Sequence, residues 1–182
     1  MPMRLLPLLC LLTACGDKSS DDDASDGSDT GGTDSGPPVV DGCDPDAAAG
    51  LVIGQGAGSA FFALEDLAAV GLDVAPQGGF GVSVRALTTG LVSDSIVDVR
   101  LDVEHNGENV GSFVNEGTNL YCQDDGSGLL WGVVVGFDAE NYPTNDDLLA
   151  FNGEHVILIV TATDTDGDTA EGRVEVVIEV GG

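Results

Sequence analysis

Apolar and polar residues alternate with a period of two along much of the chain after residue 80, which is typical of strands with one buried face. The clearest segment runs from Val97 to Val103, where valine and leucine alternate with aspartate and arginine. Asn106-Gly107 and Asp166-Gly167 are pairs favoured in tight hairpin turns. The pattern predicts strands at 80–86, 97–103, 108–114, 129–137, 156–163 and 174–180, with shorter ones at 51–53, 61–64 and 72–74.

About seven to nine short strands separated by turn signals predict an all-β fold, a β-sandwich. In residues 154–180 a Thr/Val-rich strand enters an Asp-Gly turn and leaves on an alternating valine strand. This segment resembles the terminal hairpin of immunoglobulin-like domains of the polycystic-kidney-disease and cadherin-like types. The resemblance implies a single immunoglobulin-like antiparallel β-sandwich over residues 43–182. The antibody-type cysteine pair is not reproduced, because Cys43 precedes every predicted strand.

Residues 1–14 have the features of a secretory signal. A short positive start is followed by a leucine-rich run that is too short for the roughly 20 residues that span a bilayer. The run ends in Leu12-Thr13-Ala14-Cys15, which resembles the lipobox of bacterial lipoproteins. The resemblance implies cleavage before Cys15 and acylation of its sulfur, and several acyl chains hold a protein stably at a membrane. The alternative is an ordinary signal peptide that contains a cysteine.

The cellular location of the protein is also predicted by resemblance. Gly16, rather than an aspartate, follows Cys15, and in the enterobacterial sorting rule this favours the outer over the inner membrane of the cell envelope. The segment 76–80, Pro-Gln-Gly-Gly-Phe, is similar to one in uncharacterised envelope lipoproteins of Gram-negative bacteria, and it implies no activity.

Residues 15–42 are predicted to form the acylated cysteine and a disordered acidic tether. Beyond Cys15 they are almost wholly Asp, Ser, Gly, Thr and Pro, and such a segment buries too little apolar surface to offset its ordering entropy. A flexible chain of this length spans roughly 30 Å, with a contour limit of about 95 Å. The tether therefore suffices to lift a domain clear of lipid headgroups.

Acidic residues dominate the charge of the whole chain, and not only of the tether. The chain contains 32 acidic and 5 basic residues, a net charge of −27. Eight of the acids precede residue 43, and 24 follow it together with only three arginines. Such a charge repels nucleic-acid phosphate, so no nucleic-acid partner is expected. It suits solubility, cation binding or a basic partner.

Two of the four cysteines are predicted to form a disulfide. Cleavage removes Cys10 and acylation uses Cys15, which leaves Cys43 and Cys122 as an even pair in an oxidising compartment. A bridge between them would pin the start of the domain to a loop in its middle. The alternative is two free thiols.

A calcium site is considered at Asp164, Asp166 and Asp168, because calcium takes six to eight oxygen ligands. Glycine comes fourth in this loop, whereas it comes sixth in an EF-hand. The other interpretation is a polar hairpin tip, since such turns favour Asp and Gly. Acids on other predicted loops are further candidate ligands for this site: Asp124, Asp125, Asp138, Glu140, Asp146 and Asp147.

The segment 51–59 imitates a dinucleotide-binding strand and glycine turn. Ser59 holds the place of the third glycine, and no acidic residue closes the next strand near Val74. A glycine-rich turn between edge strands is therefore the better prediction.

No sequence motif specifies a catalytic site, and no cofactor is predicted. His105 and His155 are expected to be surface residues. Trp131 and Phe137 are expected in the core rather than in a sugar-stacking site.

The sequence thus predicts a non-enzymatic envelope module, anchored to a membrane by lipid, that binds a protein or polysaccharide or acts as a spacer. The alternatives are a calcium-dependent adhesion module and an exported hydrolase that uses acidic residues. The oligomeric state is not predicted.

Overall fold

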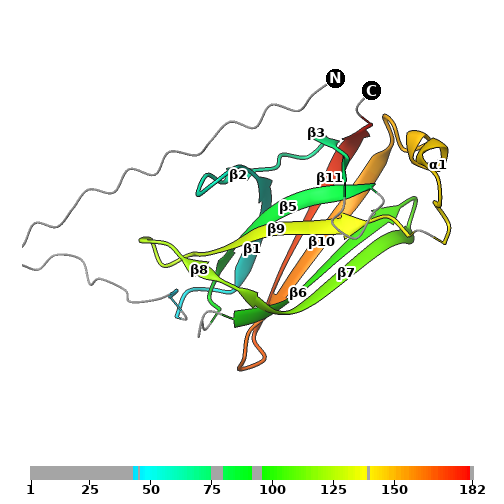
Figure 1. The fold of residues 1–182 in the computed structure, drawn as a ribbon. Helices are drawn as coiled ribbons and strands as arrows, with labels where there is room; N and C mark the ends of the chain where they lie inside the picture. Colours follow the sequence, from blue (N-terminus) through cyan, green and yellow to red (C-terminus); the bar gives the residue numbers. More distant parts are fainter. Residues whose placement is uncertain (1–42, 45, 75–79, 92–95, 139, 181–182) are drawn as a thin grey trace, which may run out of the picture. The chain divides into compact units, whose positions relative to one another are not determined.

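Two β-sheets pack face to face in the part of the chain that the structure describes (Figure 1). The structure is a computed structural model, and it describes residues 43–44, 46–74, 80–91, 96–138 and 140–180. All of them belong to one compact unit, Gly36–Gly182.

Sheet A has six strands in the order β2-β1-β5-β9-β8, with β4 also paired to β5. Sheet B has five strands in the order β3-β11-β10-β6-β7. The strands of sheet A are β1 (Gly50–Gln55), β2 (Phe62–Ala63), β4 (Asp73–Val74), β5 (Phe80–Thr89), β8 (Tyr121–Cys122) and β9 (Gly128–Gly136). Those of sheet B are β3 (Ala68–Gly71), β6 (Ile96–His105), β7 (Glu108–Asn119), β10 (His155–Thr163) and β11 (Thr169–Glu179). One short helix, α1 (Asn145–Leu149), precedes β10.

The predicted all-β sandwich is confirmed, and every strand predicted from alternation overlaps an observed strand. The sequence did not predict β3, β8 or α1, each of which is too short to show a period. β3 runs parallel to β11, so sheet B is mixed rather than purely antiparallel. The Asn106-Gly107 turn joins β6 to β7 with both residues at positive φ, 52° and 83°, as a type I′ turn requires.

The core lies between the two sheets and is built by the alternation that the sequence shows. Along β6 and along β10, every second residue is buried. Each fully buried valine or leucine contributes about 1.5–3 kcal/mol relative to an exposed one. The buried residues that these two strands contribute to the core are Val97, Val99, Leu101, Val103, Val156, Leu158, Val160 and Ala162.

A β-bulge interrupts the alternation of β9. Ala86 of β5 pairs with Leu130, and Val84 pairs with Val133, so β9 carries one extra residue over this interval. Gly132 lies within the bulge with a φ of 61°, a left-handed conformation that glycine adopts without strain. Residues of β9 before the bulge therefore lie on the opposite face of the sheet from the one that simple alternation predicts.

The bulge makes the prediction for Trp131 wrong. Leu130 is fully buried in the core, whereas Trp131 lies on the outer face of sheet A and is 43% exposed. Beyond the bulge the original phase holds, and Phe137 is buried in the core as predicted.

Candidate functional site

A disulfide joins Cys43 to Cys122, as predicted. It attaches the segment before β1 to β8, at an edge of sheet A. Next to it, the amide of Asp44 donates a 2.8 Å hydrogen bond to the carbonyl of Gly126 in the β8–β9 turn. The start of the domain is therefore held at one end of sheet A by a covalent and a polar link.

Cys15 and the predicted tether lie outside the described residues. Among the residues that are described, no helix is long and apolar enough to cross a membrane.

The hairpin predicted to hold calcium is organised by its own backbone. One carboxylate oxygen of Asp164 accepts hydrogen bonds from the amides of Asp166 and Asp168, at 3.0 and 2.9 Å. Within the described residues, no three acidic, histidine or cysteine side chains are grouped to hold a metal. Asp164 thus acts as the cap of a hairpin turn, and calcium binding stays a prediction from sequence alone.

The other candidate acids also make local hydrogen bonds. Asp125 accepts from the hydroxyl and the amide of Ser127, which lowers the pKa of Asp125. Asp138 accepts from the amide of Glu140, and Asp147 completes a capping box with Thr144 at the start of α1. The turn that holds Asp125 and the segment after Gly136 lie at opposite ends of β9, so the loops do not gather these carboxylates at one end.

The glycine-rich segment forms a turn between β1 and β2, as predicted, and these strands pair antiparallel. One guanidinium nitrogen of Arg85 donates to the carbonyls of Gly58 and Ala60, at 2.7 and 2.9 Å. The ring of Phe61 packs so closely on Gly54 that a Cβ there would lie 2.5 Å from a ring carbon. The turn is thereby fastened to the outer face of sheet A.

Both histidines lie within hydrogen-bond distance of a carboxylate near the surface. His105 lies 3.3 Å from a carboxylate oxygen of Glu154, and His155 lies 2.9 Å from one of Glu175. These pairs link neighbouring segments of sheet B.

A row of four side chains crosses the outer face of sheet A, one from each of four neighbouring strands. Val52 on β1 pairs with Leu87 on β5. Leu87 pairs with Leu129 on β9, which pairs with Tyr121 on β8. The flanking residues on β5 and β9 point into the core, so alternation places the row outside. Val52 and Tyr121, at the two ends of the row, are 47% and 43% exposed, whereas Leu87 is half-buried and Leu129 is buried beneath its neighbours.

Trp131 and Arg85 lie beside this row. Trp131 stacks on Tyr121, with ring centroids 4.6 Å apart and planes inclined by 22°. The guanidinium carbon of Arg85 lies 5.8 Å from the centroid of the Trp131 ring, in cation–π range. We call these residues the sheet A face: Val52, Arg85, Leu87, Tyr121, Leu129 and Trp131.

Tyr121 and Arg85 flank Trp131. β5 and β8 lie on opposite sides of β9, so Arg85 and Tyr121 approach Trp131 from opposite sides. Tyr121 stacks on the Trp131 ring, and Trp131 remains 43% exposed.

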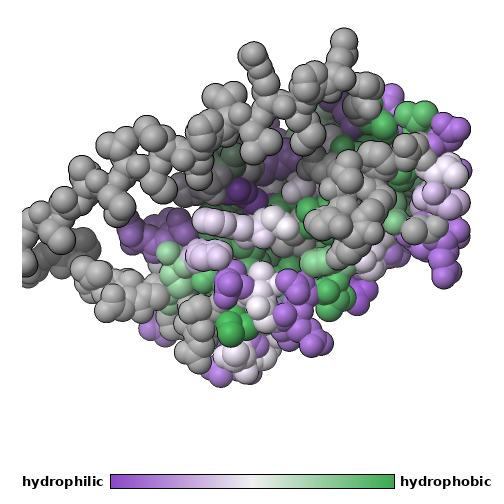
Figure 2. Space-filling view, viewed as in Figure 1, coloured by the Kyte–Doolittle hydropathy of each residue, from purple (hydrophilic) through white to green (hydrophobic). Residues whose placement is uncertain are grey.

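The strands that carry the sheet A face contain no acidic residue. Within β1, β2, β5, β8 and β9 the single charged side chain is Arg85. Figure 2, drawn from the same side as Figure 1, shows green and near-white residues at the surface over this part of the molecule. A hollow of about 260 Å³ adjoins Arg85 and is lined by Gln55, Gly56, Ser83, Val84 and Arg85.

A second polar cluster lies on sheet B around Asp102. Its carboxylate accepts hydrogen bonds from Arg100, at 2.6 and 3.0 Å, from Ser112, and from Asn109 at 3.1 Å. Burial raises the pKa of Asp102, but these hydrogen bonds and the charge of Arg100 outweigh it, so the pKa lies below its usual value. The cluster therefore keeps Asp102 ionised.

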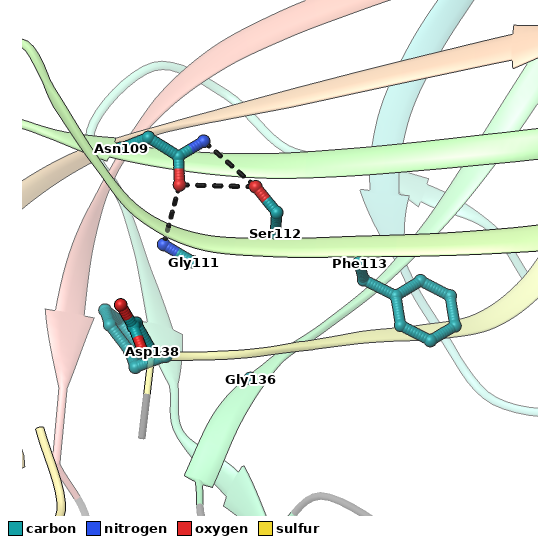
Figure 3. A pocket seen from close by; sticks show the side chains of 7 residues that line it. Asn109, Gly111, Ser112, Phe113, Gly136 and Asp138 are labelled. Atoms are coloured by element: carbon teal, nitrogen blue, oxygen red, sulfur yellow. Dashed lines mark hydrogen bonds between the residues drawn. The ribbon is translucent and has the colours of Figure 1, made fainter. Parts of the chain in front are cut away.

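A hollow of about 520 Å³ adjoins this cluster (Figure 3). The side chain of Asn109 is engaged there with the amide of Gly111 and the hydroxyl of Ser112. The polar groups of the cluster thus bind one another and stabilise the β6–β7 pair. The lining residues are Asn109, Gly111, Ser112, Phe113, Gly136, Phe137 and Asp138.

Sequence reasoning missed the sheet A face, because it placed Trp131 in the core. A usable signal was present: the acid-free segments stand out in a chain of such negative charge.

The chain matches no protein-family model, and no curated protein is similar enough to count as a match. Its function is therefore argued from the residues themselves.

Proposed function

We propose that this protein is a lipid-anchored module of the bacterial cell envelope that binds a partner through the sheet A face and catalyses no reaction. The anchor is supported by the lipobox resemblance at Cys15 and by the acidic tether that follows it. The observation that carries the binding function is the exposure of Trp131, Tyr121 and Val52 on strands that hold no acidic residue, β1, β8 and β9, in a chain of net charge −27.

Of the two expected partner classes, the geometry favours a protein over a polysaccharide. Sugars stack on the flat faces of aromatic rings, and the Trp131 ring already stacks on Tyr121 and has the Arg85 guanidinium in cation–π range. Tryptophan, tyrosine and arginine are enriched at the energetic centres of protein interfaces, where charged side chains are depleted. The sheet A face has this composition.

The binding function is tested by photo-crosslinking in living cells. A photoreactive amino acid at Val52 samples the sheet A face, and the matched control places it at Val114, a 59% exposed valine on β7 of sheet B. We expect a discrete crosslinked product from position 52 and none from position 114. Equal products, or no product at position 52, would contradict the proposal.

The anchor is tested separately by mass spectrometry of the protein extracted from membranes. The expected mature chain begins at Cys15 and carries the mass of its acyl groups. The variant Cys15→Ser should lose both the acyl mass and the membrane association. An unmodified chain with an intact leader would contradict the anchor and leave the crosslinking result standing.

A further inference from the structure

We infer that the occupant of the sheet A face is a second copy of this chain, so that two anchored molecules pair through their A sheets. This inference rests on the proposed function and names its partner.

Charge is the first argument. Two copies of a chain with net charge −27 repel one another, and most approaches bring carboxylates together. The strands of sheet B carry eight acidic residues, all exposed or half-buried. Of the sheet A strands, β1, β2, β5, β8 and β9 carry none, and β4 carries one, Asp73. Two copies can therefore meet through this face without burying opposed carboxylates. A surface that binds a basic partner carries acidic residues at the point of contact. The sheet A face carries none, so it does not fit a basic partner.

The single charge on the face does not oppose pairing. Arg85 already donates to the carbonyls of Gly58 and Ala60 and lies over the ring of Trp131. Its guanidinium keeps its charge but is solvated by carbonyl dipoles and the aromatic ring of its own molecule. A two-fold axis lying in the plane between the two sheets, along the row from Val52 to Tyr121, would bring Val52 and Tyr121 of one copy against the same residues of the other, as isologous dimers do.

The size of the face predicts a weak dimer. Five strands spaced about 4.8 Å apart and averaging about six residues at 3.3 Å each present roughly 500 Å² per copy. This area falls in the range of transient interfaces, below the roughly 800 Å² per partner of stable ones. Tethers with a contour of about 95 Å hold both copies in one thin layer at the membrane, which raises their effective concentration.

The self-association is tested by sedimentation equilibrium on the full chain carrying Cys15→Ser, which removes the anchor. The protein is followed up to about 1 mM, the effective concentration that short tethers impose. We expect a monomer–dimer equilibrium that strengthens when the salt concentration is raised about tenfold, because salt screens the repulsion between copies.

Val52→Glu should weaken the dimer by about tenfold or more, because it opposes two carboxylates at the interface. Val114→Glu adds the same charge at an exposed valine of sheet B and should change the dimer little. Tyr121→Glu is a second interface variant should Val52→Glu fail to fold, and circular dichroism checks all three.

A monomer at every concentration would overturn the inference, as would a dimer that both glutamate variants weaken equally or that neither weakens. In cells, the product crosslinked at position 52 should have twice the mass of the chain, and it should contain both tags when two tagged copies are co-expressed. A product of any other mass would overturn pairing between copies while leaving the proposed binding function intact.

Discussion

The two sheets of this domain share one core but present different outer surfaces. Sheet A shows solvent a valine, a Tyr–Trp stack and one arginine, and the single acidic residue on its six strands is Asp73 of β4. Sheet B shows eight acidic residues on β6, β7 and β11, with Arg100 and Arg173 paired among them.

The difference teaches that the net charge of a chain is not a uniform property of its surface. A carboxylate on a solvated face has no desolvation penalty, but the penalty is large wherever a partner removes the surrounding water. Sheet B has the composition of a face that stays wet, and sheet A has that of a face that becomes covered. Variants on the two sheets should therefore differ in how much they lower the free energy of unfolding, and the effects below run from the largest to the smallest.

The largest effect is expected from the Cys43–Cys122 disulfide at the edge of sheet A, since the described strands of sheet B contain no cysteine. Cys43→Ser with Cys122→Ser opens a loop of 79 residues. In the chain-entropy model this lowers the free energy of unfolding by about 4–5 kcal/mol. Urea unfolding of the oxidised wild type and the double variant measures it. Reduced wild type should match the double variant, and a difference below about 1 kcal/mol would contradict the expectation.

The next largest effect is a difference in stability between variants on the two faces of β9. Leu130→Ala creates a cavity in the core and should cost about 2–5 kcal/mol. Trp131→Ala removes a half-exposed ring and its stacking, and should cost about 1 kcal/mol. Thermal or urea unfolding compares the two variants. If Trp131→Ala proved the more damaging, the bulge at Gly132 would be misplaced.

A smaller effect is expected on the pH dependence of stability, and it comes from Asp102 on sheet B. The pKa of Asp102 is lowered in the fold, so its contribution is present above the unfolded pKa of about 3.9 and is lost as the pH falls through the folded value. Asp102→Asn should therefore be less stable than wild type at neutral pH, and this difference should shrink below about pH 4. Urea midpoints measured across this range test it. A difference that is constant with pH would refute the role of the ionised carboxylate.

The smallest effect is expected from an exposed ion pair of sheet B. Arg173 and Glu104 lie 3.3 Å apart with half-exposed side chains. Glu104→Gln should change the free energy of unfolding by less than about 1 kcal/mol, because such pairs lie in high dielectric and are screened. A loss as large as that of Leu130→Ala would show that the acidic face stabilises the fold.

The strands and turns of this domain were predictable because each rests on local signals. Alternation marks β6 and β10, and Asn106-Gly107 marks the turn after β6. The pairing of Cys43 with Cys122 followed from a count of the cysteines that remain after the predicted cleavage and acylation.

The face of Trp131 was not predictable from alternation. A single extra residue at Gly132 reverses the phase of a strand, and glycine in a strand does not by itself distinguish a bulge from a flat pair. β3 was missed because its four residues pair with β11, a strand more than 100 positions later, and such pairing leaves no local pattern. The local caps made by Asp125 and Asp164 likewise depend on turn geometry that composition does not specify.

The disulfide also determines how the domain bears mechanical load. A pull on the chain before Cys43 passes through the bridge to Cys122 and on to β9, β10 and β11. Residues 44–121, which include β1 to β7, lie within the closed covalent loop and are bypassed by tension between the two chain ends. Stretching at the N-terminal side therefore cannot unzip β1 from β5 while the bridge is intact, and the reduced protein should yield at a lower force.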